Sequence, residues 1–189
     1  MDSKPIIRYI TVKEAIGKYT DYINEHINNV KRAFNELEST LDKLNEEKIL
    51  NFDKDELVRN IKDHDHSKFS DYEFNGYRQW FYPVNGADRY KNLYDKAWNH
   101  HKEVNPHHPE HWVVHDPMKN NNVVTIMEMP DVYLAELICD WQAMSYKFNN
   151  NPLEYYKKEG YKLPFSPETK LKLVNILNYI YSKKENKNG

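Results

Sequence analysis

Several features that mark large protein classes are missing or scarce in this sequence. Its 189 residues include 5 glycines and a single cysteine, Cys139. Scarce glycine argues against a glycine-rich phosphate loop, and neither GxxxxGK[ST] nor GxGxxG occurs. A lone cysteine cannot form an internal disulfide, which favours a reducing, cytoplasmic setting. Because no apolar run approaches about 20 residues, we expect no membrane span.

An excess of charge of one sign is also lacking. Lys and Arg total 27 and Asp and Glu total 29, so the net charge is −2. Without a basic stripe, a nucleic-acid polymer ranks last among the partners we consider. The start, "MDSKPIIRYITVKE", has no basic segment followed by a long apolar run, so we expect no signal peptide. The length suits a single domain over residues 1–189, with a frayed tail at 182–189.

What the sequence does contain is helical periodicity. Apolar residues recur at steps of three and four between residues 19 and 44, which predicts one long amphipathic helix. Asp53, followed three residues later by Glu56, predicts the capped start of a second helix. We expect that helix to run into His64 and Asp65, so that both side chains project from its end.

Three further helices are predicted, with one irregular insert. They lie over residues 87–101, after Pro130, and from Ser166, which caps a helix that has Pro167 at its first position. The stripe predicted for the last helix consists of Leu171, Val174, Leu177 and Ile180. Between the third and fourth helices, two β-branched runs flank "KNNN", which predicts a loop or short hairpin. The fold class is therefore all-α.

The histidines and acidic residues suggest a metal site. Nine histidines occur, at positions 26, 64, 66, 100, 101, 107, 108, 111 and 115. His26 lies beside the buried stripe of the first helix, and Asp140 lies among apolar positions of the fourth. Either residue alone has an ordinary explanation, as a satisfied core histidine or a capping or paired aspartate. Taken with His64 and Asp65, they form a set of imidazoles and carboxylates on separate helices, as divalent transition metals require.

The ordered set resembles the HD superfamily of metal-dependent phosphohydrolases. "YINEHINNVKRAFNEL" is similar to that family's first ligand helix and implies His26 as a ligand. "HDHSK" resembles the His-Asp-x-Gly/Ser-Lys signature and implies roles for His64, Asp65 and Lys68. "ELICDWQAMS" resembles the late helix that supplies a final aspartate, here Asp140. The resemblance implies an HD-type helical bundle.

A further segment resembles HD variants with a second metal. "AWNHHKE" is similar to their His-His-Glu and implies His100 and His101 as ligands, although Lys102 stands where a glutamate would. The Gly-Tyr-Pro of the cyclic-di-GMP-degrading branch is missing, so that substrate is not expected. The chain also resembles, over most of its length, small phage and bacterial proteins with HDxSKF and AWxHHxxxNPHH motifs.

The resemblance implies a divalent-metal-dependent phosphohydrolase acting on a nucleotide or other small phosphate ester. One or two ions of Mn, Fe, Co, Ni or Zn would activate a water molecule as the nucleophile. Asp65 would bind metal and orient the water, and Lys68 would contact the phosphate. Arg78 and Lys102 are further candidates for phosphate contacts, with an ordinary solvated charge as the alternative for each.

The donor of the leaving-group proton is left open. Some nucleotidases of the superfamily carry a glutamic acid three residues after the aspartate, and Lys68 occupies that place here. His66, His100 or His101 would then have to act, and His101 is our choice of catalytic residue. Glu73 is undecided between acid and supporting roles.

Two other functions fit the same residues. One is an HD-fold diiron oxygenase that cleaves a C–C or C–P bond with O₂. The other is a non-catalytic, metal-stabilised binding module of phage origin. In each case we expect a cytoplasmic location in a bacterial cell or a phage-infected host, with a homodimer as one option.

The remaining histidines are open to more than one interpretation. His115-Asp116 repeats the His-Asp pair in the predicted insert but is followed by Pro117, so we assign it a structural or surface role. In "NPHHPEHW", three histidines either pack near Trp112 or supply one ligand to a second metal, namely His107, His108 and His111.

Overall fold

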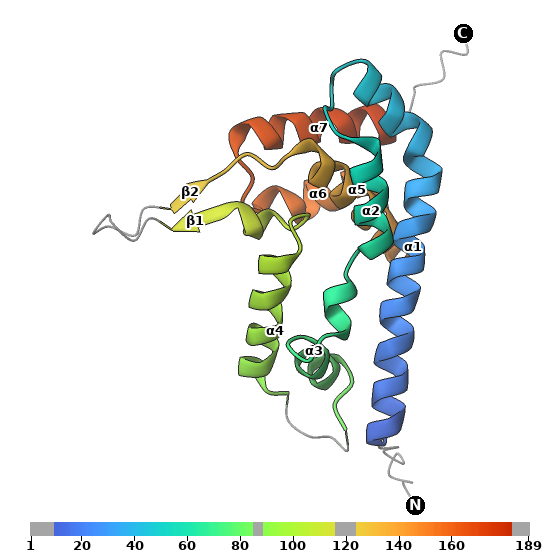
Figure 1. The fold of residues 1–189 in the computed structure, drawn as a ribbon, viewed down its shortest axis with the longest axis vertical. Helices are drawn as coiled ribbons and strands as arrows, with labels where there is room; N and C mark the ends of the chain where they lie inside the picture. The colour runs from blue at the N-terminus through green and yellow to red at the C-terminus, as the bar shows by residue number, and fades with distance from the viewer. Residues whose placement is uncertain (1–9, 85–88, 116–123, 183–189) are drawn as a thin grey trace, which may run out of the picture. The chain divides into compact units, whose positions relative to one another are not determined.

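The apolar stripe near the N-terminus forms one long helix. The computed structural model describes residues 10–84, 89–115 and 124–182, and its first helix, α1, runs over Val12–Glu46 (Figure 1). In the described residues the chain is 73% helical, with seven α-helices and a two-stranded sheet. The predicted all-α class is therefore confirmed, as is the predicted first helix.

The chain divides into two compact units. Unit 1 consists of Met1–Glu25 and Asp65–Val104. Unit 2 consists of His26–His64 and Asn105–Gly189. The boundaries pass within α1, after Val104, and between His64 and Asp65, so the two residues of the His-Asp pair fall in different units. The single HD-like domain over residues 1–189 stays a prediction.

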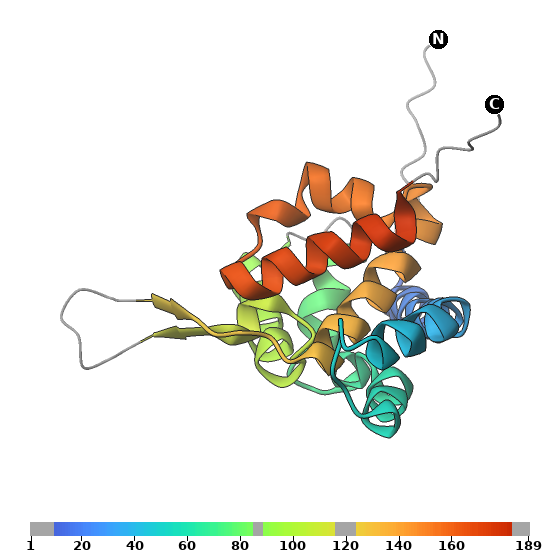
Figure 2. The ribbon, with the colours of Figure 1, turned by 90° about the horizontal axis from the view of Figure 1, so that it is seen from above.

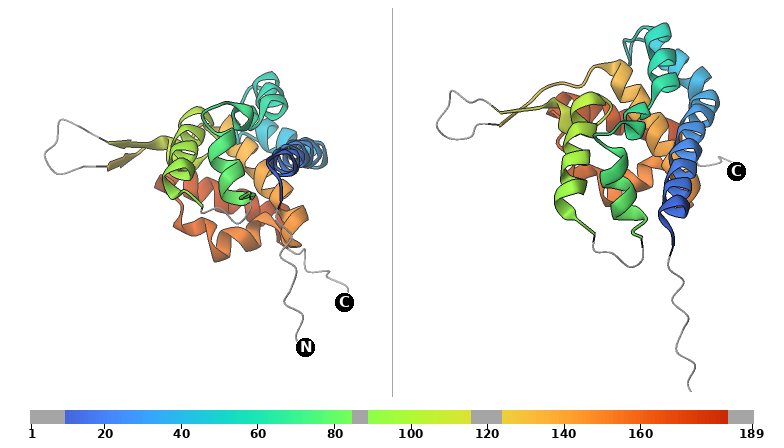
Figure 3. Two further views of the ribbon diagram at one scale, coloured as in Figure 1. Left: turned by 90° about the horizontal axis from the view of Figure 1, so that it is seen from below. Right: turned by 60° about the horizontal axis from the view of Figure 1, so that its bottom comes forward.

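Unit 1 combines the start of α1 with a short 3-10 helix and two α-helices. These are η1 (His66–Phe69), α3 (Phe74–Phe81) and α4 (Lys91–Val104). The periodicity did not predict α3, which packs beside α4 (Figure 3). A side chain at Gly76 would place its Cβ 2.5 Å from the carbonyl oxygen of Leu93, so this close approach of the two helices requires glycine.

Aromatic rings fill much of unit 1. The rings of Tyr77 and Tyr94 join α3 to α4 in an edge-on contact with centroids 5.7 Å apart. Tyr19 of α1 makes a similar contact with Phe74, at 5.0 Å. Such pairs add a directional preference to the apolar area they bury, so they set the packing of these helices.

In unit 2, α2 (Lys54–Asp63) begins where the cap predicts. The Asp53 carboxylate accepts hydrogen bonds from the backbone N–H groups of Asp55 at 2.7 Å and Glu56 at 3.1 Å. The helix ends at Asp63, however, so the expectation that it runs into His64 and Asp65 is wrong. Asp65 has φ 57°, in the left-handed region, and an α-helix cannot continue through that conformation.

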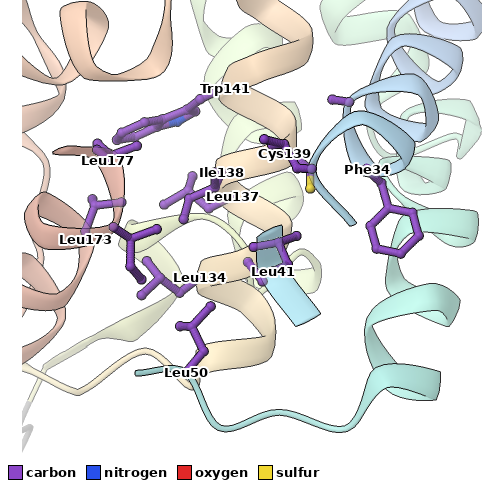
Figure 4. Close-up of a cluster of buried hydrophobic side chains, with 14 of the residues drawn as sticks. Phe34, Leu41, Leu50, Leu134, Leu137, Ile138, Cys139, Trp141, Leu173 and Leu177 are labelled. Carbon is purple, nitrogen blue, oxygen red and sulfur yellow. The ribbon is translucent and has the colours of Figure 1, made fainter. Parts of the chain in front are cut away.

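The core of unit 2 lies around α5 (Asp131–Phe148). Packed near it are the end of α1, α6 (Pro152–Lys158), a 3-10 turn η3 (Gly160–Lys162) and α7 (Pro167–Tyr181). Figure 4 shows the buried side chains, among them Leu41, Leu134, Leu137, Ile138, Leu173 and Leu177. Cys139 lies in this core, as expected of a lone apolar-like thiol, and burial raises the pKa of its thiol.

The last helix has the predicted cap, and its buried face agrees with the predicted stripe at Leu177, with Val174 and Ile180 partly buried, but not at Leu171. Ser166 Oγ accepts from the N–H of Thr169 at 3.1 Å, and Pro167 is the first helical residue. Leu171, predicted to face inward, is 65% exposed, while Leu173 and Ile176 are buried. Apolar residues at 171, 173, 176 and 177 allow one stripe that includes Leu171 and another that includes Leu173 and Ile176. Tertiary packing buries the stripe with Leu173 and Ile176.

The predicted insert forms a short hairpin after a 3-10 helix, η2 (Pro109–Trp112). Strands β1 (Val113–His115) and β2 (Val124–Ile126) run antiparallel with Val113 opposite Ile126 (Figure 2). The "KNNN" turn, Asp116 and the predicted tail beyond Ser182 lie outside the described residues. Within the described ranges, none of the helices has the length and apolarity needed to cross a membrane.

Candidate metal site and histidine clusters

Three residues predicted as metal ligands meet in unit 2. His26 comes from α1, His64 from the residue after α2, and Asp140 from α5. His26 Nε2 lies 3.2 Å from Asp140 Oδ1, and His64 Nε2 lies 3.8 Å from the same oxygen. Ligand atoms of the three residues all lie within 4.8 Å of one another. Three segments far apart in the sequence therefore supply one group of nitrogen and oxygen donors.

These donors suit a divalent cation in both chemistry and spacing. Metal–nitrogen and metal–oxygen bonds of about 2.1 Å in a tetrahedral site separate neighbouring ligand atoms by about 3.4 Å. The separations of 3.2 and 3.8 Å lie on either side of that value. All three residues are buried, and polar groups of this kind are rarely buried except in partnership with each other or with a metal.

A fourth residue, Glu136, belongs to this neighbourhood and was missed in the sequence. It precedes Asp140 by four residues, so the two carboxylates lie on one face of α5. Glu136 Oε1 lies 2.8 Å from His64 Nδ1 and 3.2 Å from His107 Nδ1. The available signal was an acidic residue one helical turn before Asp140 in an otherwise apolar helix.

Both carboxyl groups of α5 are held in the ionised form. Burial by itself would raise the pKa of Glu136, but hydrogen bonds from His107 and His64 outweigh it and lower that pKa to about 2. Burial acts on Asp140 in the same way, and the neighbouring imidazoles of His26 and His64 bring its pKa well below the usual value. An ionised carboxylate only accepts hydrogen bonds, so the imidazoles must donate to it or share a cation with it.

His64 links the two carboxylates through its two ring nitrogens. Its Nδ1 faces Glu136 and its Nε2 faces Asp140, so two groups of three residues share this ring. The groups are His26, His64 and Asp140, and His64, His107 and Glu136. With the proton on Nδ1, the lone pair on Nε2 is directed to the side of Asp140. The first group is therefore the better metal site, with Glu136 as the carboxylate that orients its histidine.

The other histidines of unit 2 divide between this cluster and the surface. Of the three left open, His107 is buried and joins Glu136, while His108 packs against the His107 ring with centroids 4.3 Å apart. His111 contacts the ring of Trp112 at 5.0 Å, as the packing alternative predicted. His115 is exposed at the end of β1, in agreement with the surface role assigned to it.

In unit 1, Asp65 and Lys68 form a close ion pair. Lys68 Nζ lies 2.5 Å from Asp65 Oδ2, and the Lys68 side chain is only 16% exposed. The sequence did not predict this contact. The left-handed backbone of Asp65, followed by η1, produces it, with the Lys68 N–H donating to the Asp65 carbonyl at 3.0 Å.

A second chain of contacts starts at the same aspartate. Asp65 Oδ1 lies 3.3 Å from His101 Nε2, and His101 Nδ1 lies 2.8 Å from Glu73 Oε2. The other oxygen of Glu73 lies 2.7 Å from His100 Nδ1. Glu73, undecided in the sequence, is thus a fully buried carboxylate that joins the two neighbouring histidines of α4.

The acid–base properties of this cluster follow from burial and pairing. Burial favours a raised pKa for Glu73, but hydrogen bonds from His101 and His100 outweigh it and lower the pKa. Burial lowers the pKa of His101, against the attraction of the Asp65 and Glu73 carboxylates, which favours its neutral form. The cluster therefore holds the Glu73 carboxylate in its ionised form and favours the neutral form of the His101 imidazole.

The other predicted site residues are exposed or half-buried. His66 is exposed on η1, and Arg78 and Lys102 are half-buried on α3 and α4. Asp63 is exposed, as expected. The roles of Asp65, Lys68, His100 and His101 in metal binding or catalysis stay predictions.

Comparison with protein families places most of the chain in one group. Residues 15–179 match the model of a family described as "Family of unknown function (DUF5662)". The chain belongs to this family. No curated protein and no solved structure matches it. The match to DUF5662 includes both histidine clusters, from His26 to Asp140 in unit 2 and from Asp65 to His101 in unit 1. In this member of DUF5662, buried His, Asp and Glu groups could therefore hold a metal ion.

Proposed function

We propose that this chain is a divalent-metal-dependent phosphohydrolase that acts on a nucleotide or another small phosphate ester. The observation that carries the proposal is the meeting of His26, His64 and Asp140 from three segments at distances suited to one cation. The order of these residues, with the His-Asp pair and Lys68, is also the order of the HD superfamily that the sequence resembles. A mixed nitrogen and oxygen set favours Mn, Fe, Co, Ni or Zn.

The chain's own residues supply the other parts of the chemistry. A bound divalent cation would polarise a phosphoryl oxygen and lower the pKa of its water. Glu136 would keep the proton of His64 on Nδ1, so that the lone pair of Nε2 would be available to bind the metal. The Lys68 ammonium, now paired with Asp65, is the group we assign to the phosphate, where it would offset negative charge that develops during transfer.

The first test measures metal binding and hydrolysis in the same preparations. The full chain is loaded with Mn²⁺, Fe²⁺ or Zn²⁺, its metal content is determined, and turnover is followed with AMP and bis(p-nitrophenyl) phosphate. We expect stoichiometric metal and metal-dependent release of phosphate or p-nitrophenol. His26→Gln and Asp140→Asn should lose both metal and activity. Their matched controls, His115→Gln and Asp63→Asn, change exposed residues and should retain both.

Each alternative function predicts a different result. Turnover that requires O₂ and two bound irons would replace hydrolysis by an oxygenase reaction. Metal binding lost in His26→Gln, with no turnover of any phosphate ester by the wild type, would leave a metal-stabilised binding module. Hydrolysis that survives Asp65→Ala would overturn the role that the HD resemblance assigns to Asp65.

A further inference from the structure

We infer that Glu73 is a positioning residue that fixes His100 and His101 in the same tautomer, with the proton on Nδ1 and the acceptor lone pair on Nε2. The inference goes beyond the proposed function and does not depend on the reaction. It concerns three residues of unit 1, and it changes what the two histidines can do chemically.

The geometry of Glu73 carries this inference. Its two carboxylate oxygens each lie within hydrogen-bond distance of a different imidazole, Oε1 at 2.7 Å from His100 Nδ1 and Oε2 at 2.8 Å from His101 Nδ1. The residue is fully buried, so the histidines take the place of water as its donors. Because an ionised carboxylate only accepts, each Nδ1 must donate. In the form that carries a single N–H, each ring therefore has an unprotonated Nε2.

The rings are also held against rotation. His101 lies against Tyr77 in an edge-on contact with centroids 5.9 Å apart and against Trp98 at the same separation. The His100 ring is stacked on Tyr72 at 4.8 Å, with the two planes 11° apart. Ring flips that would exchange the two nitrogens therefore disturb packed aromatic neighbours as well as the bond to Glu73.

A competing arrangement exists at one of the two rings. Ser67 Oγ lies 3.4 Å from His101 Nδ1 and could donate its proton to that nitrogen. The contact with Glu73 is shorter, and a hydrogen bond to a charged group is the stronger kind. Ser67 also bonds to Glu73, which leaves its hydroxyl proton on the carboxylate side.

The consequence is a reassignment of roles. A neutral histidine with Nε2 unprotonated accepts a proton or binds a cation through that atom, and it cannot donate a proton from it. His101 therefore does not suit the role of proton donor to a leaving group that the sequence suggested. Its Nε2 lies 3.3 Å from Asp65 Oδ1, a longer contact than the 2.8 Å between Nδ1 and Glu73, so the ring's N–H is assigned to the Glu73 side.

His100, whose Nε2 is also an acceptor, lines a pocket. It lines a cavity of about 400 Å³ between α3 and α4, together with Tyr72, Asn75 and Lys96. Small-molecule sites typically have volumes of about 300–1,000 Å³. The His100 side chain is 27% exposed, and its Nδ1 is occupied by Glu73, so a ligand in the pocket meets it as an acceptor.

The test is a ¹⁵N NMR measurement of histidine tautomers in the full chain at pH 8, after dialysis against EDTA. Two-bond couplings distinguish protonated from unprotonated ring nitrogens, and His100→Gln and His101→Gln assign the signals. Both rings should show a protonated Nδ1 and an unprotonated Nε2. A wild-type spectrum with the proton on Nε2 of either ring would overturn the inference even if no variant folds.

Glu73→Gln then separates positioning from mere packing. The glutamine keeps the size of the side chain but has one acceptor oxygen and one donor nitrogen, so it can hold only one ring with Nδ1 protonated. The other ring should change to the Nε2–H form. Asp71→Asn, an exposed carboxylate two residues away, should leave both tautomers unchanged. Two Nδ1–H rings in a folded Glu73→Gln would show that Glu73 does not set them.

Discussion

Nδ1 of His64 lies 2.8 Å from Oε1 of Glu136, and both residues are buried. With Nδ1 in this contact, the other ring nitrogen of His64, Nε2, faces Asp140. A carboxylate behind a metal-binding histidine sets the tautomer and the basicity of that ligand. The pair therefore connects a residue of the His-Asp motif with a carboxylate that the motif does not contain.

The first prediction concerns that pair. Glu136→Gln removes the charge that holds the Nδ1 proton of His64, and we expect metal affinity to fall about 10- to 100-fold, as is usual for residues that support a ligand. Isothermal titration of the metal-free chain with Zn²⁺ measures the change. Glu154→Gln, an exposed glutamate of α6, is the control. Equal affinity of the two variants would contradict the role of Glu136.

The second prediction concerns acid stability. The pKa of Glu136 is lowered from 4.5 to about 2, because hydrogen bonds from His107 and His64 outweigh the opposing effect of burial. A carboxyl with a depressed folded-state pKa stabilises the fold above its unfolded pKa. That stability is lost as the pH falls from about 4.5 towards 2. For this group the full effect is on the order of 3 kcal/mol.

Urea unfolding of the EDTA-treated chain between pH 6 and pH 2.5 measures the loss. In Glu136→Gln the free energy of unfolding should depend less steeply on pH below 4.5, because the titrating group is gone. Parallel curves for the two proteins would show that Glu136 contributes nothing to acid unfolding.

The third prediction compares two helical glycines. In Gly76→Ala the new Cβ meets the Leu93 carbonyl oxygen at 2.5 Å and the Ala97 Cβ at 2.9 Å, so α3 and α4 must move apart. We expect a loss of about 1–3 kcal/mol in the free energy of unfolding, as for other overpacked sites. Gly17 lies in α1 with nothing within 4 Å of its Cβ position, so Gly17→Ala should stabilise by about 1 kcal/mol. Thermal unfolding of both variants gives the signs, and a stabilised Gly76→Ala would refute the close approach.

The fourth prediction tests the face that α7 buries. Leu173→Ala opens a cavity in the unit 2 core and should cost about 2–5 kcal/mol. Leu171→Ala alters a side chain that is 65% exposed and should change stability by less than about 0.5 kcal/mol. Urea denaturation of the two single variants measures the difference. A larger loss in Leu171→Ala would restore the stripe that the sequence alone predicted.

Local features of the sequence predicted much of the helical structure. The stripe between residues 19 and 44, the Asp53 cap and the Ser166 cap all correspond to observed features, because each depends on residues within one or two turns. The short helices α3 and α6 were missed, since seven or eight residues carry too little periodicity to stand out.

The candidate metal site divides in the same way. His26, His64 and Asp140 were found because each falls beside or among apolar positions of a predicted helix, and the HD resemblance ordered them. Glu136 and Glu73 were not assigned, because a glutamate on a helix is ordinarily a surface residue. A buried glutamate is distinguished from a surface glutamate only by its partners on other segments of the chain.

The sequence by itself therefore determined the all-α class, the starts of α2, α5 and α7 and the set of candidate ligands, all of which depend on short-range pattern and side-chain chemistry. Tertiary structure decided which acid meets which histidine, with Glu136 on His64 and Glu73 on His100 and His101. It also decided the left-handed turn at Asp65 and the buried face of α7. These features depend on the register between segments up to 72 residues apart, and no local pattern encodes that register.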